Sequence, residues 1–367
     1  MIKSIAIENL RGIRRCIVEG LTDINIFIGR NGAGKSTILE AVYIASALIN
    51  ERDTLRNVNK LDYVVSRRSS RGSWNTYRDV LWFLKDVEKN IVIELKFSTG
   101  NKLRFILINA EAPSVQPVWP ILLEVPRTVV HRYGEGAVYI GCDGSGRLVV
   151  WDPYRKVVEG YLDESFYEYI KTEYRYLRNV ILLDTKLPVN IIESAVWRRV
   201  LDKRLDKFVL DLIKEEYEPG AEGIGFKPSG VGFALTLMLP NASIEVDSLG
   251  DGARIAVLYA SILALAEETG ILIEDPEVHQ HPGGLVTLMR FALRLAKEKK
   301  LQLFITTHSI ELINIVKRLA EELGLGIKVF YIERDNNTSV VDVRALESID
   351  VEILQKLGLD PRLLHIL

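Results

Sequence analysis

The spacing of apolar and polar positions in the last third of the chain predicts alternating helices and strands. ARIAVLYASILALAEE at 253–268 predicts a buried helix, and the apolar run ILI at 271–273 predicts a short interior strand. LVTLMRFALRLAKEKK predicts an amphipathic helix, and LQLFITT and IKVFYIER predict two further strands. Strands that alternate with helices in this way favour a parallel, mostly covered sheet.

The start of the chain predicts a strand, a loop and a helix. Residues 3–9 and 23–28 predict strands, and STILEAVYIASAL at 36–48 predicts a helix. Further along, NIVIELKF, KLRFILIN, GAVYIGC and RLVVWD between 91 and 151 are separated by turn signals and predict an antiparallel sheet. Residues 160–217 contain few glycines or prolines and predict helices, before GFALTLML returns to a strand.

These elements predict an α/β fold with a mostly parallel core sheet. We expect the core to comprise 1–50 and 236–345. A polar linker and an antiparallel β subdomain are expected at 51–159, and a helical insertion that returns to the core at 160–235. Residues 346–367 are expected to form a C-terminal tail.

Composition narrows the class of protein. The chain has 367 residues, of which 48% are hydrophobic, which is enough for a large core. Two cysteines cannot build a disulfide framework, and no apolar run approaches the ~20 residues of a membrane span. The N-terminus alternates like a strand and lacks the core of a signal peptide. We therefore expect a cytoplasmic protein with no membrane partner.

The stretch GRNGAGKST fits the phosphate-binding pattern G-x4-G-K-S, between a predicted strand and a predicted helix. Glycines allow backbone N–H groups to surround phosphates at a helix N-terminus. Lys35 can reach the β and γ phosphates of a nucleotide, and the Ser36 hydroxyl can bind Mg²⁺. The predicted ATP-binding residues are Gly29, Arg30, Asn31, Gly32, Ala33, Gly34, Lys35, Ser36 and Thr37.

A second Gly-rich stretch precedes the predicted buried helix. In EVDSLGDGARIA, Ser248, Gly250 and Gly252 lie where a hydroxyl and backbone amides can point outward from a helix N-terminus. This predicts a second anion-binding loop. Taken alone, the stretch also fits an ordinary Gly-rich helix start.

Three acids follow the apolar run ILI. A phosphate-loop ATPase needs one acid for the Mg²⁺ shell and a second for the attacking water. If Asp275 held the metal, Pro276 would stand at the position of the base, whereas Glu274 as the metal acid puts Asp275 there. We therefore predict Glu274 as the Mg²⁺ acid, Asp275 as the base and Glu277 as a support for the loop. The alternative is that these acids only solvate a strand end.

Another predicted strand ends in Thr306, Thr307, His308 and Ser309. Ligands of doubly wound sheets bind at the carboxyl ends of the strands, so His308 is placed to touch a γ-phosphate. A structural role at the strand end is the alternative. Glu277, His279 and His281 could also be interpreted as a metal site, but no further histidine or cysteine cluster completes a zinc shell.

Basic residues are concentrated in two segments. The net charge of −2 means that the chain as a whole has no excess of positive charge that would indicate nucleic-acid binding. Residues 51–80 contain seven basic and four acidic residues, and WRRVLDKRLDK occupies 197–207. Either segment could contact a phosphate backbone without sequence specificity, or could simply be a solvated face.

Four stretches together resemble the ATP-binding cassette superfamily of ATPase heads: GRNGAGKST as Walker A, SLGDGAR as the signature loop, ILIEDPE as Walker B, and TTHS with the switch histidine. IENLRGI, PEVHQHP and THSIELI make the chain similar to the OLD-type branch, which is related to RecF and SMC heads. The resemblance covers about 1–50 and 240–345, with no toprim domain expected. Walker B reads Glu-Asp rather than Asp-Glu or Glu-Glu, and Gln116 is the candidate for the Q-loop.

The resemblance implies that two heads sandwich two ATP molecules. Each nucleotide would lie between the Walker A loop of one chain and the signature loop of the other, so Ser248 and Gly250 would act in trans. ATP and Mg²⁺ are implied, together with control of a separate nuclease or toxin in repair or defence. Slow hydrolysis is expected because Asp275 is one methylene shorter than the usual glutamate, so the base stands back from the water. The alternatives are the nucleotide-binding subunit of a transporter and a slow or non-hydrolysing ATP switch.

Overall fold

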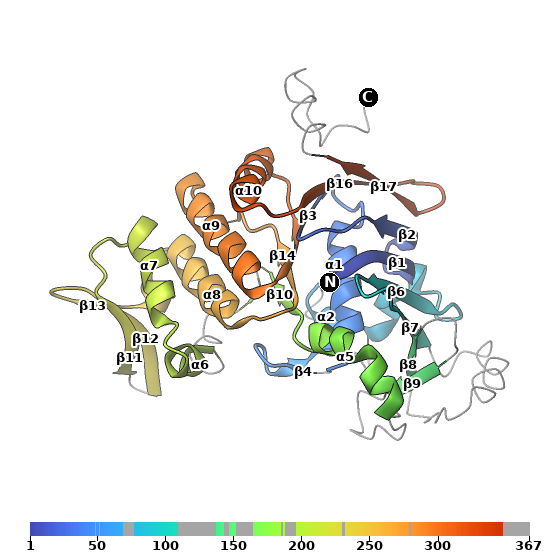
Figure 1. Cartoon of the computed structure of the whole chain (residues 1–367), viewed down its shortest axis with the longest axis horizontal. Helices are drawn as coiled ribbons and strands as arrows, with labels where there is room; N and C mark the ends of the chain where they lie inside the picture. The colour runs from blue at the N-terminus through green and yellow to red at the C-terminus, as the bar shows by residue number, and fades with distance from the viewer. Residues whose placement is uncertain are drawn as a thin grey trace, which may run out of the picture.

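The computed structural model describes residues 1–47, 49–50, 52–68, 77–108, 137–142, 147–151, 164–184, 186–187, 196–229, 232–278 and 280–347. Predictions that concern Gln116, His279, Arg71 and the tail beyond 347 lie outside these residues. Figure 1 shows one large sheet with helices against it, and a small sheet that stands apart beside α7.

The elements of the first half are β1 (Ile2–Leu10), β2 (Ile13–Glu19), β3 (Ile24–Gly29), α1 (Lys35–Ala47), β4 (Arg52–Asp53), β5 (Val58–Asn59), α2 (Lys60–Ser66), the 3₁₀ helices η1 (Arg78–Leu81) and η2 (Phe83–Lys85), β6 (Ile91–Phe97), β7 (Lys102–Ile108), β8 (Ala137–Cys142), β9 (Arg147–Trp151), α5 (Glu164–Arg178) and β10 (Ile181–Leu183). Those of the second half are α6 (Trp197–Asp202), α7 (Asp206–Glu216), β11 (Gly223–Ser229), β12 (Gly232–Met238), β13 (Ser243–Glu245), the 3₁₀ helix η5 (Val246–Ser248), α8 (Asp251–Leu265), β14 (Gly270–Glu274), α9 (Pro282–Lys299), β15 (Gln302–Thr306), α10 (Ile310–Leu323), β16 (Ile327–Arg334) and β17 (Val340–Leu346).

Twelve strands of the described residues form one mixed sheet, in the order β10-β14-β15-β3-β16-β17-β2-β1-β6-β7-β8-β9. From β10 to β16 adjacent strands are parallel, and from β2 to β9 they are antiparallel. β17 lies between the two groups, antiparallel to β16 and parallel to β2. β15, which precedes the predicted switch histidine, lies between the strand of the phosphate loop and the strand of the acids. The predicted α/β fold is confirmed.

The two faces of the parallel strands bury separate cores. Ile24, Ile26 and Ile28 of β3 pack with α8, α9 and α10, whereas Phe27 packs on the face that carries α1. Side chains of a strand alternate between its faces, and burial on both faces explains why β3 is an uninterrupted apolar run apart from Asn25. The amide of Asn25 satisfies its hydrogen bonds with the backbone of Thr22 and Leu303.

Several strands of the described residues depart from the sequence-based expectations, among them β11, which lies inside the expected helical insertion and pairs with β12. Ile181–Leu183 lies inside the segment predicted to be helical, yet it forms β10 and pairs with β14 at the edge of the core. Ile13–Glu19 and Val340–Leu346 were not predicted and form β2 and β17. The predicted antiparallel strands are present, and they continue the large sheet through β1 and β6. Among the described residues, none of the helices has both the length and the apolar content needed to cross a bilayer.

Candidate active site

The Gly-rich loop between β3 and α1 has the backbone geometry that its glycines allow. Gly29, Gly32 and Gly34 all have positive φ, and a Cβ atom on Gly29 would lie 2.1 Å from the carbonyl oxygen of Ile332. Only glycine fits at residue 29, because β16 approaches the loop at that point. The N-terminus of α1, which begins at Lys35, is thereby left facing the loop.

Lys35 folds back onto the loop that contains it. Its Nζ donates hydrogen bonds to the carbonyl oxygens of Gly29 at 2.9 Å and Arg30 at 3.1 Å. Burial lowers the pKa of Lys35, while the negative charges of Asp275 and Glu277 act in the opposite direction. The lysine of the loop and two acids after β14 therefore share one electrostatic environment.

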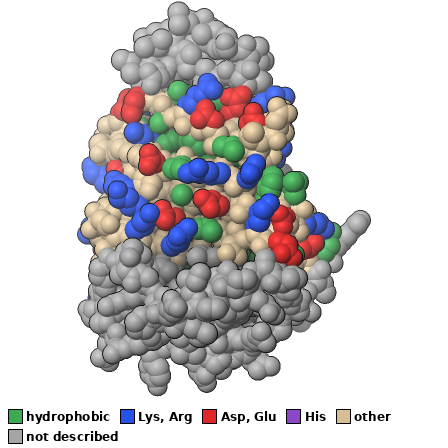
Figure 2. All heavy atoms as spheres, turned by 90° about the vertical axis from the view of Figure 1, so that its right-hand side faces the viewer, with side chains coloured by type: hydrophobic (Ala, Val, Ile, Leu, Met, Phe, Trp, Pro, Cys, Tyr) green, Lys and Arg blue, Asp and Glu red, His purple; other side chains and the backbone are tan. Residues whose placement is uncertain are grey.

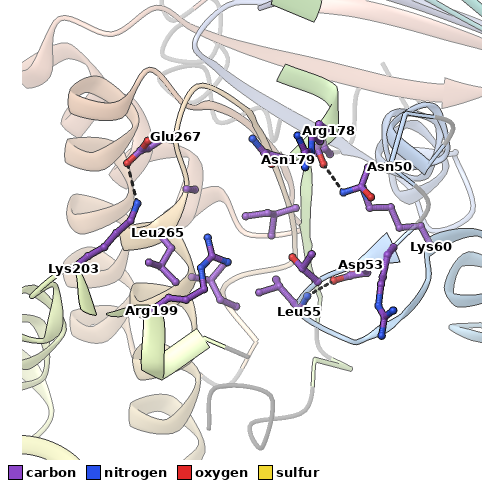
Figure 3. Close-up of a pocket in the computed structure, with 16 residues that line it drawn as sticks. Asn50, Asp53, Leu55, Lys60, Arg178, Asn179, Arg199, Lys203, Leu265 and Glu267 are labelled. Carbon is purple, nitrogen blue, oxygen red and sulfur yellow. Dashed lines mark hydrogen bonds and ion pairs between the residues drawn. The ribbon is translucent and has the colours of Figure 1, made fainter. Parts of the chain in front are cut away.

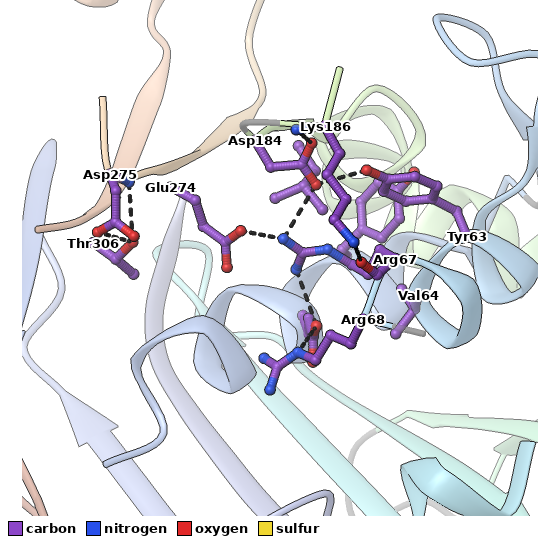
Figure 4. A network of polar contacts seen from close by, with 12 residues as sticks. Tyr63, Val64, Arg67, Arg68, Asp184, Lys186, Glu274, Asp275 and Thr306 are labelled. Carbon is purple, nitrogen blue, oxygen red and sulfur yellow. Dashed lines mark hydrogen bonds and ion pairs between the residues drawn. The ribbon is translucent and has the colours of Figure 1, made fainter. Parts of the chain in front are cut away.

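The two adjacent acids after β14 point to different partners (Figure 4). Leu272 packs on the α1 face of the sheet, and strand alternation puts Glu274 on that same face. There Oε2 of Glu274 accepts a hydrogen bond from Arg67. Asp275 has a φ of +43°, and its carboxylate accepts a 3.4 Å hydrogen bond from the Thr306 hydroxyl. Adjacent residues thus serve two distinct positions of the site.

Asp275 has an unusual electrostatic environment for an aspartate. Burial, together with the charges of Glu277 and Glu274, raises its pKa to about 6, although Lys35 and the Thr306 hydrogen bond oppose the shift. A carboxyl whose pKa is raised toward neutrality is better suited to accept a proton than an ordinary aspartate.

Glu277 holds the end of β15. Its Oε1 accepts hydrogen bonds from the Thr307 hydroxyl at 2.6 Å and from the backbone N–H of His308 at 3.0 Å. Ser309 then caps α10 by accepting from the amide of Leu312. The His308 side chain is exposed at the carboxyl edge of the sheet, as the sequence predicts.

A buried ionic network lies behind Glu274 and joins α1, α2 and the end of β10 (Figure 4). Arg67 forms ion pairs with Glu40 at 3.0 Å, with Asp184 at 3.1 Å and with Glu274. Burial alone would lower the pKa of Arg67, but these three carboxylates outweigh it and raise the pKa. The guanidinium is therefore permanently charged.

The sequence analysis missed Asp184 and Glu40. A signal for Asp184 was present, since ILLD repeats the pattern of an apolar strand ending in an acid that ILIE shows at 271–274. Glu40 lies in the middle of α1 and gave no such signal. Its carboxylate is fully buried and is also bound by Arg11 at 2.5 Å and by Arg68 at 3.0 Å.

The network corrects the interpretation of 51–80 as a nucleic-acid contact or a solvated face for Arg56 and Arg67, whereas Arg52 and Arg68 of the same segment are exposed. Arg56, Lys60 and Arg67 are only 9%, 2% and 8% exposed, and both arginines form ion pairs inside the protein. The positive charges of Arg56 and Arg67 balance buried carboxylates, whereas the ammonium of Lys60 donates to the hydroxyl of Ser46. Figure 2 shows basic and acidic side chains interspersed over the described part of another face, so that face has no continuous basic stripe either.

The predicted signature loop is exposed at the start of α8. Gly250 precedes the first residue of the helix, and Ser248 is exposed. Among the residues that the structure describes, no hydrogen bond or ion pair joins these two residues to the loop at 29–37.

Gln280 connects the loop after the acids to the N-terminus of α8. Its Nε2 donates to the carbonyl oxygen of Gly252 at 3.0 Å, and its Oε1 accepts from the Tyr217 hydroxyl at 2.7 Å. His281 caps α9 by accepting from the amide of Gly283. Within the described ranges, which omit residue 279, no group of three His, Cys, Asp or Glu side chains is arranged to hold a metal ion.

A Gly-rich loop between a buried parallel strand and a helix, with acids and a histidine at the ends of the adjacent strands, defines a phosphate-loop nucleotide-binding domain. The sequence model of the family described as "AAA ATPase domain" matches residues 1–112 and 170–313. The chain belongs to this family, and parts of it are similar to a RecF and a Rad50 protein.

Two named relatives share part of the chain. The DNA double-strand break repair Rad50 ATPase of Archaeoglobus fulgidus is 33% identical over 22% of this chain and 11% of its own length. The DNA replication and repair protein RecF of Acinetobacter baylyi is 24% identical over 54% of this chain and 49% of its own. A solved SMC head bound to the winged-helix domain of ScpA is 12% identical, with a TM-score of 0.48, over 95% of this chain and 99% of that one.

Proposed function

We propose that the chain binds and hydrolyses ATP at the carboxyl edge of the parallel strands. The observation that carries this proposal is the convergence of Lys35 with Asp275, whose carboxyl has a pKa raised to about 6. The loop at 29–37 would hold the phosphates through its backbone amides, and Lys35 would leave the carbonyl oxygens of Gly29 and Arg30 to bind them.

The donor atoms near the loop fit Mg²⁺, which takes oxygen ligands. Glu274 uses Oε2 for Arg67, while its Oε1 makes no hydrogen bond to the described residues. The Ser36 hydroxyl in the first turn of α1 is the second candidate ligand. When bound, Mg²⁺ would neutralise charge on the β and γ phosphates.

The remaining roles follow from the positions of the side chains. Asp275 would accept the proton of the attacking water, because its raised pKa brings it closer to neutrality. His308, exposed at the end of β15, would contact the γ-phosphate. Glu277 would stay outside the reaction and fix the backbone of His308.

We further propose that ATP joins two chains head to head. Ser248 and Gly250 make no contact with the phosphate loop of their own chain among the described residues, so they would meet the nucleotide of a second chain. The names of the Rad50 and RecF relatives support a role in DNA repair, and a role in defence is the alternative that we keep. Control of a partner nuclease or toxin in the cytoplasm, and membership of the OLD-like branch, belong to the same proposal.

Three variants test the hydrolytic assignment. Lys35→Ala should lose nucleotide binding, whereas Asp275→Asn should bind ATP with parental affinity and hydrolyse it at least about 100-fold more slowly, the contribution expected of a general base. Steady-state ATPase rates beside binding titrations decide between the outcomes. The contact between Arg67 and Glu274 favours a second candidate, a slow or non-hydrolysing ATP switch. If the unmodified protein binds ATP but does not hydrolyse it, the result would favour the ATP switch over the ATPase.

A further inference from the structure

A separate basic cavity lies at the opposite edge of the core from the phosphate loop. It has a volume of about 210 Å³ and is bounded by the segment after α1, the ends of α5 and α8, and α6 (Figure 3). The thirteen residues of α1 separate it from Lys35 by about 20 Å, at 1.5 Å per helical residue. A second cavity of about 300 Å³ adjoins it and shares Asn50, Thr54, Arg178, Asn179 and Arg199 with it.

The lining of the two cavities is strongly basic, in a chain whose net charge is −2. Asp53 and Glu267 are the acidic residues that line them, and both are already paired, with Arg56 at 2.8 Å and Lys203 at 3.5 Å. The basic residues that line them are Arg52, Lys60, Lys171, Arg175, Arg178, Arg199 and Lys203. The lining therefore carries a local excess of positive charge.

Two arginines stand where the cavities meet. Figure 3 shows Arg199 extending from α6 and Arg178 lying at the end of α5, and both line both cavities. Among the residues that the structure describes, no carboxylate lies within ion-pair distance of either guanidinium. The planar guanidinium group presents paired donors that match the oxygens of a phosphate.

Lys60 adds a buried charge to the same lining. It is 2% exposed, and its ammonium donates to the hydroxyl of Ser46 at 3.1 Å rather than to a carboxylate. Burial lowers the pKa of Lys60 to about 8, although Asp53 opposes the shift. A buried cation without a direct counter-ion is costly, and an anion in the cavity would offset that cost.

We propose that these joined cavities bind a terminal phosphate group, carried either by a free mononucleotide or by the end of a nucleic-acid strand. A terminal phosphate exposes three oxygens and can enter a cavity of this size, with Asn50 and Asn179 as additional uncharged donors. A phosphodiester inside a strand is flanked by sugars on both sides, so it is less suited than a terminal phosphate to approach a cation as buried as Lys60. The residues that line these cavities are distinct from those of the phosphate loop at 29–37.

The test uses the whole chain with its ATP site saturated by Mg²⁺ and a non-hydrolysable ATP analogue. Calorimetry would measure binding of inorganic phosphate, of uridine 5′-monophosphate, and of a single-stranded oligonucleotide with a 5′-phosphate or a 5′-hydroxyl. We expect the oligonucleotide with a 5′-phosphate to bind at least about tenfold more tightly than the same oligonucleotide with a 5′-hydroxyl. This difference is the effect of one or two charged hydrogen bonds. Tighter binding of the mononucleotide than of the oligonucleotide would identify the free nucleotide as the source.

Neighbouring arginines on α6 supply the matched control. Arg199→Ala should weaken binding of the phosphorylated probe about tenfold, whereas Arg198→Ala should leave it within about twofold, because the Arg198 side chain is 88% exposed and lines neither cavity. Neither substitution should change ATPase activity. Equal binding of the two oligonucleotides, or equal loss in the two variants, would overturn the site without affecting the proposed ATPase.

Discussion

Arg67 binds the carboxylate of Glu274 and so gives the acid at the end of β14 a cationic partner before any metal arrives. The adjacent acid, Asp275, lies against a threonine, and its burial, together with the charges of two other carboxylates, raises its pKa. Neighbouring acids in contrasting environments commonly divide the work of a site. The ion pair thus supports the metal acid and the base as separate roles.

Replacing Arg67 should remove the positive charge that three buried or partly buried carboxylates share. Arg67→Gln leaves Glu40, Asp184 and Glu274 without their shared cation, and we expect the free energy of unfolding to fall by about 3 kcal/mol. Removing the competitor should also shift the Mg²⁺ dependence of nucleotide binding to lower concentrations. Chemical denaturation and Mg²⁺ titrations at fixed nucleotide measure the two effects.

Arg68→Gln is the control for that change. Arg68 binds the same Glu40 at 3.0 Å, but its side chain is 43% exposed, so its loss should cost less than about 1 kcal/mol. It should not alter the Mg²⁺ dependence, since Arg68 makes no ion pair with Glu274. Equal destabilisation by both substitutions would contradict the role assigned to the buried network.

The pH dependence of turnover should report Asp275. Its pKa is raised to about 6, and the protonated carboxyl cannot accept a proton, so kcat/KM should fall as the pH drops below about 6. Glu277→Gln removes one of the charges that raise this pKa, so the fall in kcat/KM should then occur at lower pH. Profiles of kcat/KM against pH for both proteins between pH 5 and 8 would test this. If the fall occurs at the same pH in both, another group is titrating.

Glu277→Gln and Glu277→Ala should differ in activity. Glutamine keeps an oxygen that can accept from the Thr307 hydroxyl and the His308 amide, so substantial ATPase activity should remain. Alanine removes both hydrogen bonds, frees the end of β15 and should lower kcat about tenfold or more, through misplacement of His308. If the glutamine variant is inactive while Asp275→Asn still turns over ATP, the assignment of the base is wrong.

A negative charge at Ser248 should prevent ATP-driven dimerisation. Glutamate would stand against the phosphates of the opposing chain, and like charges repel strongly in a poorly hydrated interface. Ser248→Ala adds no charge and should still dimerise. Light scattering with Mg²⁺ and ATP distinguishes them, and a Ser248→Glu protein that dimerises and hydrolyses like the parent would remove the trans role of this loop.

Gly29→Ala should destabilise the protein far more than Gly32→Ala. The added Cβ at residue 29 would meet the carbonyl oxygen of Ile332 at 2.1 Å, and we expect a loss on the order of 3 kcal/mol from the clash and from the positive φ. At residue 32 no atom lies within 4 Å of the added Cβ, so only the cost of positive φ remains, about 1 kcal/mol. Thermal or denaturant unfolding of the two variants makes the comparison.

Local sequence patterns predicted the parallel half of the fold well. The period of the apolar residues placed β3, α1, α8, β14, α9, β15 and β16 within a few residues of their observed bounds. These elements are buried on one or both faces, and a buried face makes apolar residues recur at a regular spacing along the sequence. β10 was missed because three residues beside a long helical segment are too few to show a period.

The partners of the acids could not be predicted from the sequence. Arg67 and Glu274 are 207 positions apart, and only the packing of α2 against α1 brings the guanidinium to the end of β14. Arg56 and Lys60 read as part of a polar, basic segment, although the fold buries them. Residue type alone cannot distinguish an arginine that faces solvent from one that balances a buried carboxylate.

The hydrogen bond from Gln280 to Gly252 has a consequence for how two sites would work together. In a dimer of the proposed kind, the acids of one chain belong to one nucleotide, while the start of α8 in that same chain belongs to the other. Any shift of the loop after Asp275 during turnover would pull on the start of α8. The two ATP molecules would then be hydrolysed in sequence, with cooperative kinetics, rather than independently.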